Sequence, residues 1–90
     1  KIPVENLLGE QNSGFKIALY ILNLGRIKLA GACVGAGKAT IGLAVQYANE
    51  RKQFGTSISN FGAIKFKLAE MAIRTFATES LTYRASQNID

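Results

Sequence analysis

A cation, an amide and an aromatic ring follow one another closely in the middle of the chain, as Arg51, Gln53 and Phe54, with Gly55 directly after them. Arginine presents a rigid fork of N–H donors that matches phosphate oxygens, and glutamine adds further donors. An exposed aromatic ring packs on a flat ligand such as a base or the edge of a flavin. This ordered set therefore fits an anionic, aromatic ligand such as a nucleotide.

Arg51 also has a purely structural explanation, because it ends a long helical pattern. A cation at the C-terminus of a helix interacts favourably with the helix dipole, by about 0.3–1 kcal/mol. The structural role and the ligand role are compatible, and the residue types alone leave both open.

A second polar group, Asn23, Gly25 and Arg26, interrupts an otherwise apolar helical pattern. These residues form either a stripe that faces water or a second ligand-binding group, and their spacing does not separate the two interpretations.

The stretch ACVGAGKAT, residues 32–40, superficially resembles a phosphate-binding loop. That motif needs glycine five residues before the Gly-Lys pair and Ser or Thr directly after the lysine. Here those positions hold Ala32 and Ala39, and no strand pattern precedes them. We therefore reject a phosphate loop, and expect these small residues to let another helix approach closely despite the cost of about 1 kcal/mol for each mid-helix glycine.

Two long helices are predicted to position these groups. The first runs from Phe15 to about Arg51, where proline is absent and apolar residues recur at helical spacing, and the second from Phe61 to about Asn88. Residues 55–60 between them are rich in turn formers, so the two helices should be antiparallel. The predicted N-cap residues are Asn12 or Ser13 for the first helix and Ser59 or Asn60 for the second.

Both helices carry apolar residues on two faces, which is typical of a helix packed between neighbours. In the first helix one stripe comprises Phe15, Leu19, Leu22, Leu29, Cys33, Ala36, Ile41, Ala44 and Ala48, and a second comprises Ile17, Leu24, Ile27, Val34 and Val45. In the second helix the main stripe is Phe61, Ile64, Leu68, Met71 and Thr75, with Phe66, Ala69, Ile73, Phe76 and Tyr83 beside it. A hairpin buries one stripe per helix, so we expect an uncovered set that includes Leu24, Ile27, Val34, Ile73 and Phe76.

The length of the first helix argues against a self-contained domain. A helix of about 37 residues spans roughly 55 Å, whereas a compact chain of this length has a radius of gyration near 12 Å and a diameter of about 30 Å. Partner helices must therefore come from elsewhere. The chain also begins with Lys1 and not with methionine, so we expect a piece of a longer protein.

Composition narrows the class of protein further. With 48% apolar and 19% charged residues, the 90-residue chain is typical of one small folded unit and not of a disordered one. The net charge of +5 is spread along the chain without a nucleic-acid motif, so no nucleic acid is expected as a partner. We expect no signal peptide, and no membrane span, because Lys16, Asn23, Arg26 and Lys28 interrupt the longest apolar segment.

Metal and thiol chemistry are not expected. The chain has no histidine and a single cysteine, which excludes a zinc site of the usual kind. Cys33 lies in a run of small apolar residues and is predicted to be a buried, inert thiol.

Several segments resemble the flavin-dependent acyl-CoA dehydrogenase family. Residues 47–55, YANERKQFG, resemble its R-x-Q-F-G signature, and residues 3–9 with 14–18 are similar to the exit from its middle β domain. Residues 22–26 and 66–72 resemble its first two long C-terminal helices. The resemblance covers nearly the whole chain.

The resemblance implies an all-α fold, a long antiparallel helical hairpin that is part of a four-helix-bundle C-terminal domain. Residues 1–12 would be an extended segment from the preceding domain, and residues 13–90 two helices of the bundle. The segment that follows the turn, with Asn60-Phe61-Gly62 and later Thr78-Glu79-Ser80, looks more like the very-long-chain branch. Many members carry glutamine where this chain has Gly62, so a cofactor hydrogen bond made there is not expected.

The resemblance also implies an activity for the parent protein, the α,β-dehydrogenation of acyl-CoA thioesters with FAD as cofactor. In this reaction a glutamate removes the α-proton and the β-hydrogen passes to the flavin as hydride. The implied partners are the acyl-CoA substrate, electron-transferring flavoprotein and further copies of the same chain. The implied location is the cytoplasm, or the mitochondrial matrix in a eukaryote. The alternative is a stand-alone, self-associating helical adaptor without enzymatic activity.

Residue roles carry over by the same resemblance. Arg51 would reach the pyrophosphate of a flavin held by a neighbouring subunit, and Gln53 and Phe54 would help to hold that cofactor. Asn23 and Arg26 would lie near the CoA portion of the substrate.

No catalytic residue is expected in this chain. Some branches of the family carry the catalytic glutamate at the position of Gly25, which cannot take a proton. The base is therefore expected beyond Asp90, and the isolated fragment should be inactive.

Overall fold

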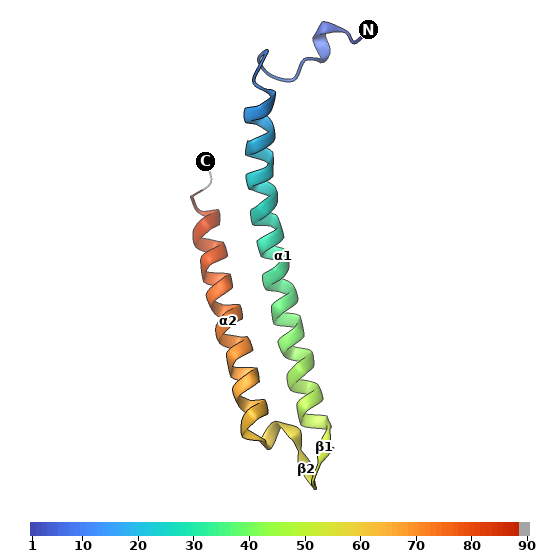
Figure 1. The fold of residues 1–90 in the computed structure, drawn as a ribbon, viewed down its shortest axis with the longest axis vertical. Helices are drawn as coiled ribbons and strands as arrows, with labels where there is room; N and C mark the ends of the chain where they lie inside the picture. Colours follow the sequence, from blue (N-terminus) through green and yellow to red (C-terminus); the bar gives the residue numbers. More distant parts are fainter. Residues whose placement is uncertain (89–90) are drawn as a thin grey trace.

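The computed structural model describes residues 1–88 as a long helical hairpin, with the turn at one end and the N-terminus and the last turn of α2 toward the other (Figure 1). The elements in chain order are η1 Val4–Asn6, α1 Gly14–Glu50, β1 Lys52–Gln53, β2 Thr56–Ser57, η2 Ile58–Asn60 and α2 Gly62–Ser86. The all-α antiparallel prediction is confirmed, and the two short strands are an addition that the sequence patterns did not predict.

The helix α1 has 37 residues and begins and ends within one residue of the predicted bounds. It ends at Glu50, and the C-cap residue Arg51 turns to an extended conformation with φ −71° and ψ 124° while its N–H donates to Tyr47 O at 2.9 Å. The segment before α1 is not extended throughout, because η1 forms one helical turn and Gly9 and Asn12 have φ of 74° and 69°.

The predicted side-chain caps are wrong for both helices. Ser13 occupies the N-cap position of α1, but its hydroxyl donates to Glu10 O instead of accepting a helical N–H. The N-cap of α2 is Phe61, which has no capping side chain. Asn60 instead donates from Nδ2 to Thr56 Oγ1 at 2.8 Å, so its side chain stabilises the turn and not the helix.

The contact between α1 and α2 follows one stripe on each helix. In α2 the predicted main stripe is half-buried, which confirms it as the contact face. In α1 the contact face combines parts of both predicted stripes, with half-buried Leu24, Ile27, Ala30, Val34, Gly37, Ile41 and Ala44 and fully buried Ala48. Ile17 is half-buried beside Gly9 of the N-terminal segment instead. The expectation that Leu24, Ile27 and Val34 stay uncovered was therefore wrong, whereas Ile73 and Phe76 are 68% and 71% exposed.

The helices α1 and α2 approach each other closely at Gly37. A Cβ built on Gly37 would lie 3.2 Å from Oγ1 and 3.4 Å from Cγ2 of Thr75, on α2. The neighbouring small residue Gly35 has nothing within 4 Å of the same position. The small-residue stretch thus serves helix packing, as predicted, and within residues 1–88 it does so at Gly37.

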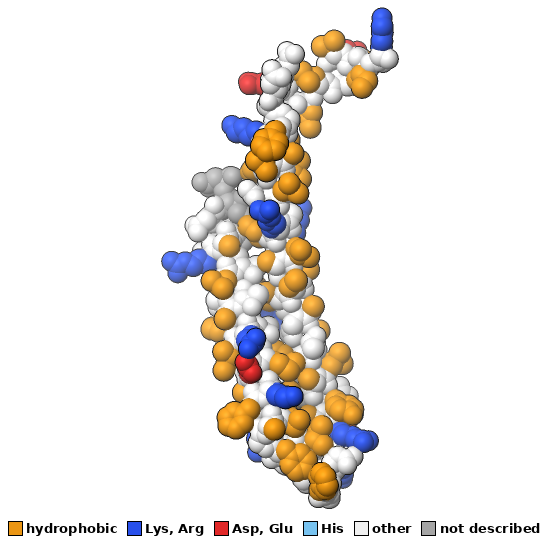
Figure 2. All heavy atoms as spheres, in the orientation of Figure 1, with side chains coloured by type: hydrophobic (Ala, Val, Ile, Leu, Met, Phe, Trp, Pro, Cys, Tyr) orange, Lys and Arg blue, Asp and Glu red, His pale blue; other side chains and the backbone are white. Residues whose placement is uncertain are grey.

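The molecule is elongated, with a radius of gyration of 22.1 Å and extents of 74 × 29 × 14 Å. Among residues 1–88 only Ala48 is a buried apolar residue, and apolar side chains lie along the surface of both helices (Figure 2). The predicted burial of Cys33 is therefore wrong, because its thiol is exposed and no helix among residues 1–88 covers that face of α1.

The expectation of no membrane-length apolar segment also needs correction. The helix α1 contains an 18-residue window of mean hydropathy 1.5 with at most two charged residues, which suffices to span a membrane by length and composition. The interrupting charges lie in the first part of α1, and between Leu29 and Asn49 only Lys38 is charged. A helix that packs between neighbours in a bundle has the same apolar composition.

Candidate functional site

Arg51, Gln53 and Phe54 lie on a small β-hairpin that projects from the end of α1 (Figure 1). Its register pairs Lys52 with Ser57 and Gln53 with Thr56, and the carbonyl of Arg51 accepts the N–H of Ile58 at 2.8 Å. Side chains two residues apart on an extended strand leave the same face. The Arg51 and Gln53 side chains therefore leave one face of a hydrogen-bonded ribbon.

Phe54 occupies the first position of the two-residue turn in a left-handed conformation. Its φ is 53° and that of Gly55 is 80°, the pattern of a type I′ hairpin turn. Glycine adopts this conformation freely, but a bulky residue does so at a cost of about 1–2 kcal/mol. The Phe54 side chain is nevertheless 94% exposed. The structure therefore holds this ring outward at a cost in backbone energy.

The charge of Arg51 is not neutralised within the described chain. Among residues 1–88 its guanidinium forms no ion pair. The adjacent carboxylate of Glu50 instead accepts a hydrogen bond from Gln46 Nε2 at 2.9 Å. With Lys52 next to it, Arg51 makes this end of the hairpin positive, which favours an anionic ligand.

The donor set of the hairpin fits a flavin nucleotide. The guanidinium of Arg51 suits a pyrophosphate, the amide of Gln53 supplies further hydrogen bonds and the ring of Phe54 offers a flat apolar surface. All three side chains are exposed and lie within one short ribbon, so one ligand can contact them together.

Asn23 and Arg26 form a separate candidate site near the other end of α1. Both are exposed, and residues three apart on a helix are neighbours on one face. At a rise of about 1.5 Å per residue, Arg26 lies roughly 38 Å along α1 from Arg51. The structure therefore brings Arg51, Gln53 and Phe54 together but places Asn23 and Arg26 elsewhere. At Gly25 nothing within 4 Å blocks a side chain, but glycine supplies no carboxylate.

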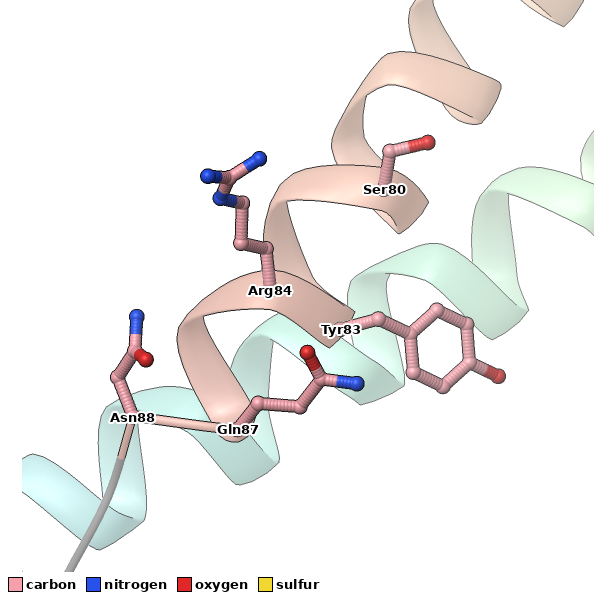
Figure 3. Close-up of a pocket in the computed structure, with 5 residues that line it drawn as sticks. All are labelled: Ser80, Tyr83, Arg84, Gln87 and Asn88. Carbon is pink, nitrogen blue, oxygen red and sulfur yellow. The ribbon is translucent and has the colours of Figure 1, made fainter.

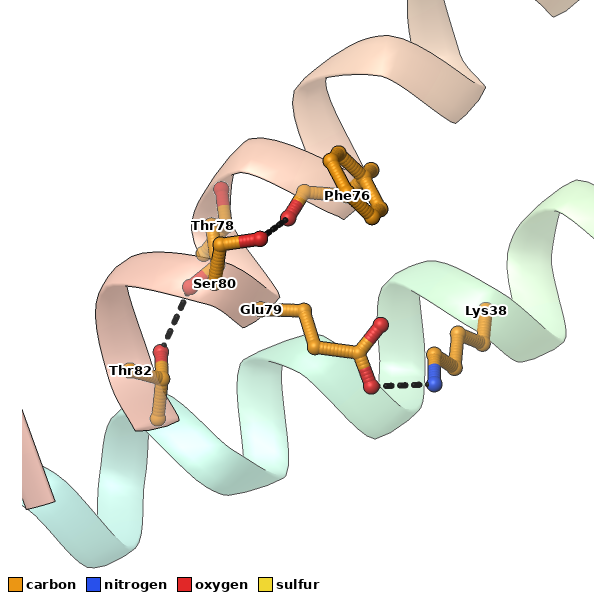
Figure 4. Close-up of polar contacts among 6 residues, drawn as sticks. All are labelled: Lys38, Phe76, Thr78, Glu79, Ser80 and Thr82. Atoms are coloured by element: carbon orange, nitrogen blue, oxygen red, sulfur yellow. Dashed lines mark hydrogen bonds and ion pairs between the residues drawn. The ribbon is translucent and has the colours of Figure 1, made fainter. Parts of the chain in front are cut away.

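Two features of the structure were not predicted from the sequence. The ring of Phe61 meets that of Phe54 edge to face, with centroids 6.3 Å apart and planes at 75°. An aromatic residue on each side of a glycine-containing turn was the available signal. Lys38 Nζ also pairs with Glu79 Oε1 across the two helices (Figure 4), a contact that no local pattern reveals.

A surface hollow of about 540 Å³ near the end of α2 is not a built site. It is lined by Ser80, Tyr83, Arg84, Gln87 and Asn88 (Figure 3). All five residues come from the C-terminal end of α2 and the residues just after it, and α1 contributes none. Such a hollow is the space between side chains along one stretch of chain, and it lies far from the β-hairpin.

Comparison with known proteins assigns this geometry to a family. Residues 12–90 match the profile described as acyl-CoA dehydrogenase, C-terminal domain. The very long-chain specific acyl-CoA dehydrogenase of Rattus norvegicus is 51% identical over all 90 residues, which span 14% of that protein. The Acetobacterium woodii caffeyl-CoA reductase–Etf complex subunit CarC is 42% identical over 90 residues, 24% of its length.

A solved structure gives the same result for the fold. The butyryl-CoA dehydrogenase of Megasphaera elsdenii superimposes with a TM-score of 0.91 at 40% identity, over 98% of this chain and 23% of that one. The chain thus spans less than a quarter of that structure, and the hairpin corresponds to one part of a larger enzyme fold.

Proposed function

The chain belongs to the acyl-CoA dehydrogenase family, within its C-terminal helical domain, and from that premise we propose that it is a segment of an FAD-dependent acyl-CoA dehydrogenase. The reaction of the whole enzyme is the α,β-dehydrogenation of an acyl-CoA thioester. This segment contributes flavin contacts, CoA contacts and subunit packing.

The observation that supports the flavin role most strongly is the β-hairpin with its unneutralised Arg51 and outward Phe54. We assign Arg51 to the pyrophosphate of FAD, Gln53 to a hydrogen bond with the cofactor and Phe54 to packing against it. FAD, when bound, supplies the hydride acceptor of the reaction. The protein side chains bind and orient the cofactor.

The second group, Asn23 and Arg26, is assigned to the CoA portion of the substrate. The distance of roughly 38 Å along α1 between Arg26 and Arg51 supports an arrangement in which the two groups serve different active sites. Arg51 would then contact the flavin of a neighbouring subunit, and the enzyme would be a homo-oligomer. The catalytic base is assigned to a glutamate beyond Asp90, because Gly25 has no acidic group.

The names of the relatives support the remaining assignments. Electron-transferring flavoprotein is the proposed acceptor, since the CarC relative is named as a subunit of an Etf complex. The rat relative is named as mitochondrial, which supports the mitochondrial matrix for a eukaryotic source and the cytoplasm for a bacterial one.

The test is to purify the full-length protein that carries this segment and measure bound flavin and acyl-CoA oxidation. We expect about one FAD per subunit, bleaching of the flavin absorbance by acyl-CoA and turnover with an electron acceptor. A full-length protein without flavin, and with no response to acyl-CoA of any chain length, would support the alternative of a helical adaptor instead.

A further inference from the structure

Phe61 lies between η2 and α2, and its ring is the aromatic partner of Phe54 within the described residues 1–88. The centroid separation of 6.3 Å and the interplanar angle of 75° lie in the favourable range for an edge-to-face pair. Phe54 is 94% exposed, so little of its surface is covered, and the ring of Phe61 is the aromatic contact that the structure gives it within residues 1–88.

The backbone of Phe61 is held firmly. Its N–H donates to Ile58 O at 3.1 Å, and its carbonyl accepts the N–H groups of Ile64 and Lys65, both at 3.1 Å. The side chain is half-buried at the start of α2. Phe61 therefore links the turn of the β-hairpin to the rigid helix pair.

We propose that Phe61 is a positioning residue for cofactor binding: the ring of Phe61 holds the ring of Phe54 in the orientation in which Phe54 contacts FAD. The inference rests on the proposed function, because it takes Phe54 as a flavin contact. An exposed ring loses rotamer freedom when a ligand binds, which costs conformational entropy. A ring that is already restrained loses less entropy on binding. An aromatic edge also favours a near-perpendicular partner plane, which an aliphatic side chain of similar bulk does not.

A double-mutant cycle in the full-length protein tests this role. The variants are Phe61→Leu, Phe54→Ala, the double variant and Phe61→Tyr as conservative rescue, and the readout is the Kd of the apoprotein for FAD from flavin fluorescence. We expect Phe61→Leu to weaken binding by about two- to tenfold, and Phe61→Tyr to bind nearly as the parent does. In the Phe54→Ala background, Phe61→Leu should cause no further loss, because the residue acts through Phe54.

Folding is monitored by circular dichroism and light scattering, and Phe61→Met replaces Phe61→Leu if the latter does not fold. If Phe54→Ala binds FAD as tightly as the parent, the proposed flavin contact of Phe54 is wrong, and the positioning role of Phe61 is wrong as well. If Phe54→Ala weakens binding but Phe61→Leu does not, only the positioning role is overturned. Additive losses in the double variant, or a loss in Phe61→Tyr equal to that in Phe61→Leu, overturn it as well.

Discussion

The ammonium group of Lys38 and the carboxylate of Glu79 form an ion pair between α1 and α2, with Nζ and Oε1 2.5 Å apart across 41 residues of sequence (Figure 4). Nearby hydroxyls of α2 bond back to their own helix, as Ser80 does to Phe76 O and Thr82 to Thr78 O. Lys38–Glu79 is thus the ionic contact between the helices within residues 1–88, and it lies beside the close approach of Gly37 to Thr75.

Removal of this ion pair should reduce stability in a pH-dependent way. The hydrogen bond to Glu79 raises the pKa of Lys38 above its ordinary 10.5, with a smaller opposing effect of desolvation. The folded state therefore holds the Lys38 proton more tightly than the unfolded state does. The contribution of the ion pair to the free energy of unfolding is present below pH 10.5 and is lost as pH rises through the pKa of Lys38 in the folded state. The Tm of the 90-residue chain should be higher than that of its Lys38→Met variant at pH 8, and the two Tm values should converge at high alkaline pH. Lys28→Met, which removes a lysine of α1 that forms no ion pair with residues 1–88, should show no such trend. A Lys38→Met difference independent of pH would contradict the role of the ion pair.

A side chain at Gly37 should compete with the packing of α2. Gly→Ala in a helix interior gains roughly 1 kcal/mol in propensity, but the new Cβ would lie 3.2 Å from Thr75 Oγ1. We expect Gly42→Ala, where nothing lies within 4 Å, to raise the Tm of the 90-residue chain more than Gly37→Ala does. Adding Thr75→Ala to Gly37→Ala should recover part of the difference. Equal Tm shifts for both glycines would show that the close approach has no energetic effect.

Arg51→Ala in the full-length protein should weaken flavin binding more than folding. Loss of one charge-assisted phosphate contact costs about 1.5–3 kcal/mol, or roughly 10- to 150-fold in Kd. The matched control is Arg74→Ala, because Arg74 is an exposed arginine of α2 that pairs with Glu70 on its own helix. Equilibrium dialysis with FAD gives the comparison. An unchanged Kd in Arg51→Ala would rule out the assignment to the pyrophosphate.

The isolated 90-residue chain should associate in solution. Phe66, Ile73 and Phe76 are 78%, 68% and 71% exposed on the outer face of α2, and apolar patches of this extent normally drive association. A symmetric dimer of hairpins would close a four-helix bundle, with domain swapping through residues 55–60 as a variant. Light scattering at micromolar concentration should give at least a dimer mass, and Phe76→Glu should shift it toward the monomer. A sharp monomer mass with protected amides would contradict this expectation.

The isolated chain should also lack dehydrogenase activity. Position 25 carries glycine, and no acidic residue lies near Asn23 and Arg26 in sequence. The purified chain with FAD, acyl-CoA and an electron acceptor is the direct assay. Turnover above the protein-free blank would place a catalytic base within these 90 residues.

The sequence by itself determined the features that depend on local pattern. Apolar spacing and the absence of proline predicted α1 and α2 to within a few residues, because helix formation depends on neighbours three and four positions away. The length of α1 predicted an elongated molecule that leaves apolar surface uncovered. Arg51, Gln53 and Phe54 were proposed as a site because their order resembles the R-x-Q-F-G signature, whereas the residue types alone left a purely structural role for Arg51 open.

Only the tertiary structure decided the features that depend on register or on long-range contact. The Lys38–Glu79 pair and the Gly37–Thr75 contact require one particular alignment of two helices, and no periodicity encodes it. The contact face of α1 contains residues from both predicted stripes, because both stripes are apolar enough to pack against α2. The left-handed Phe54 and its contact with Phe61 arise where strand pairing closes the turn, since pairing of Gln53 with Thr56 leaves two residues to reverse the chain.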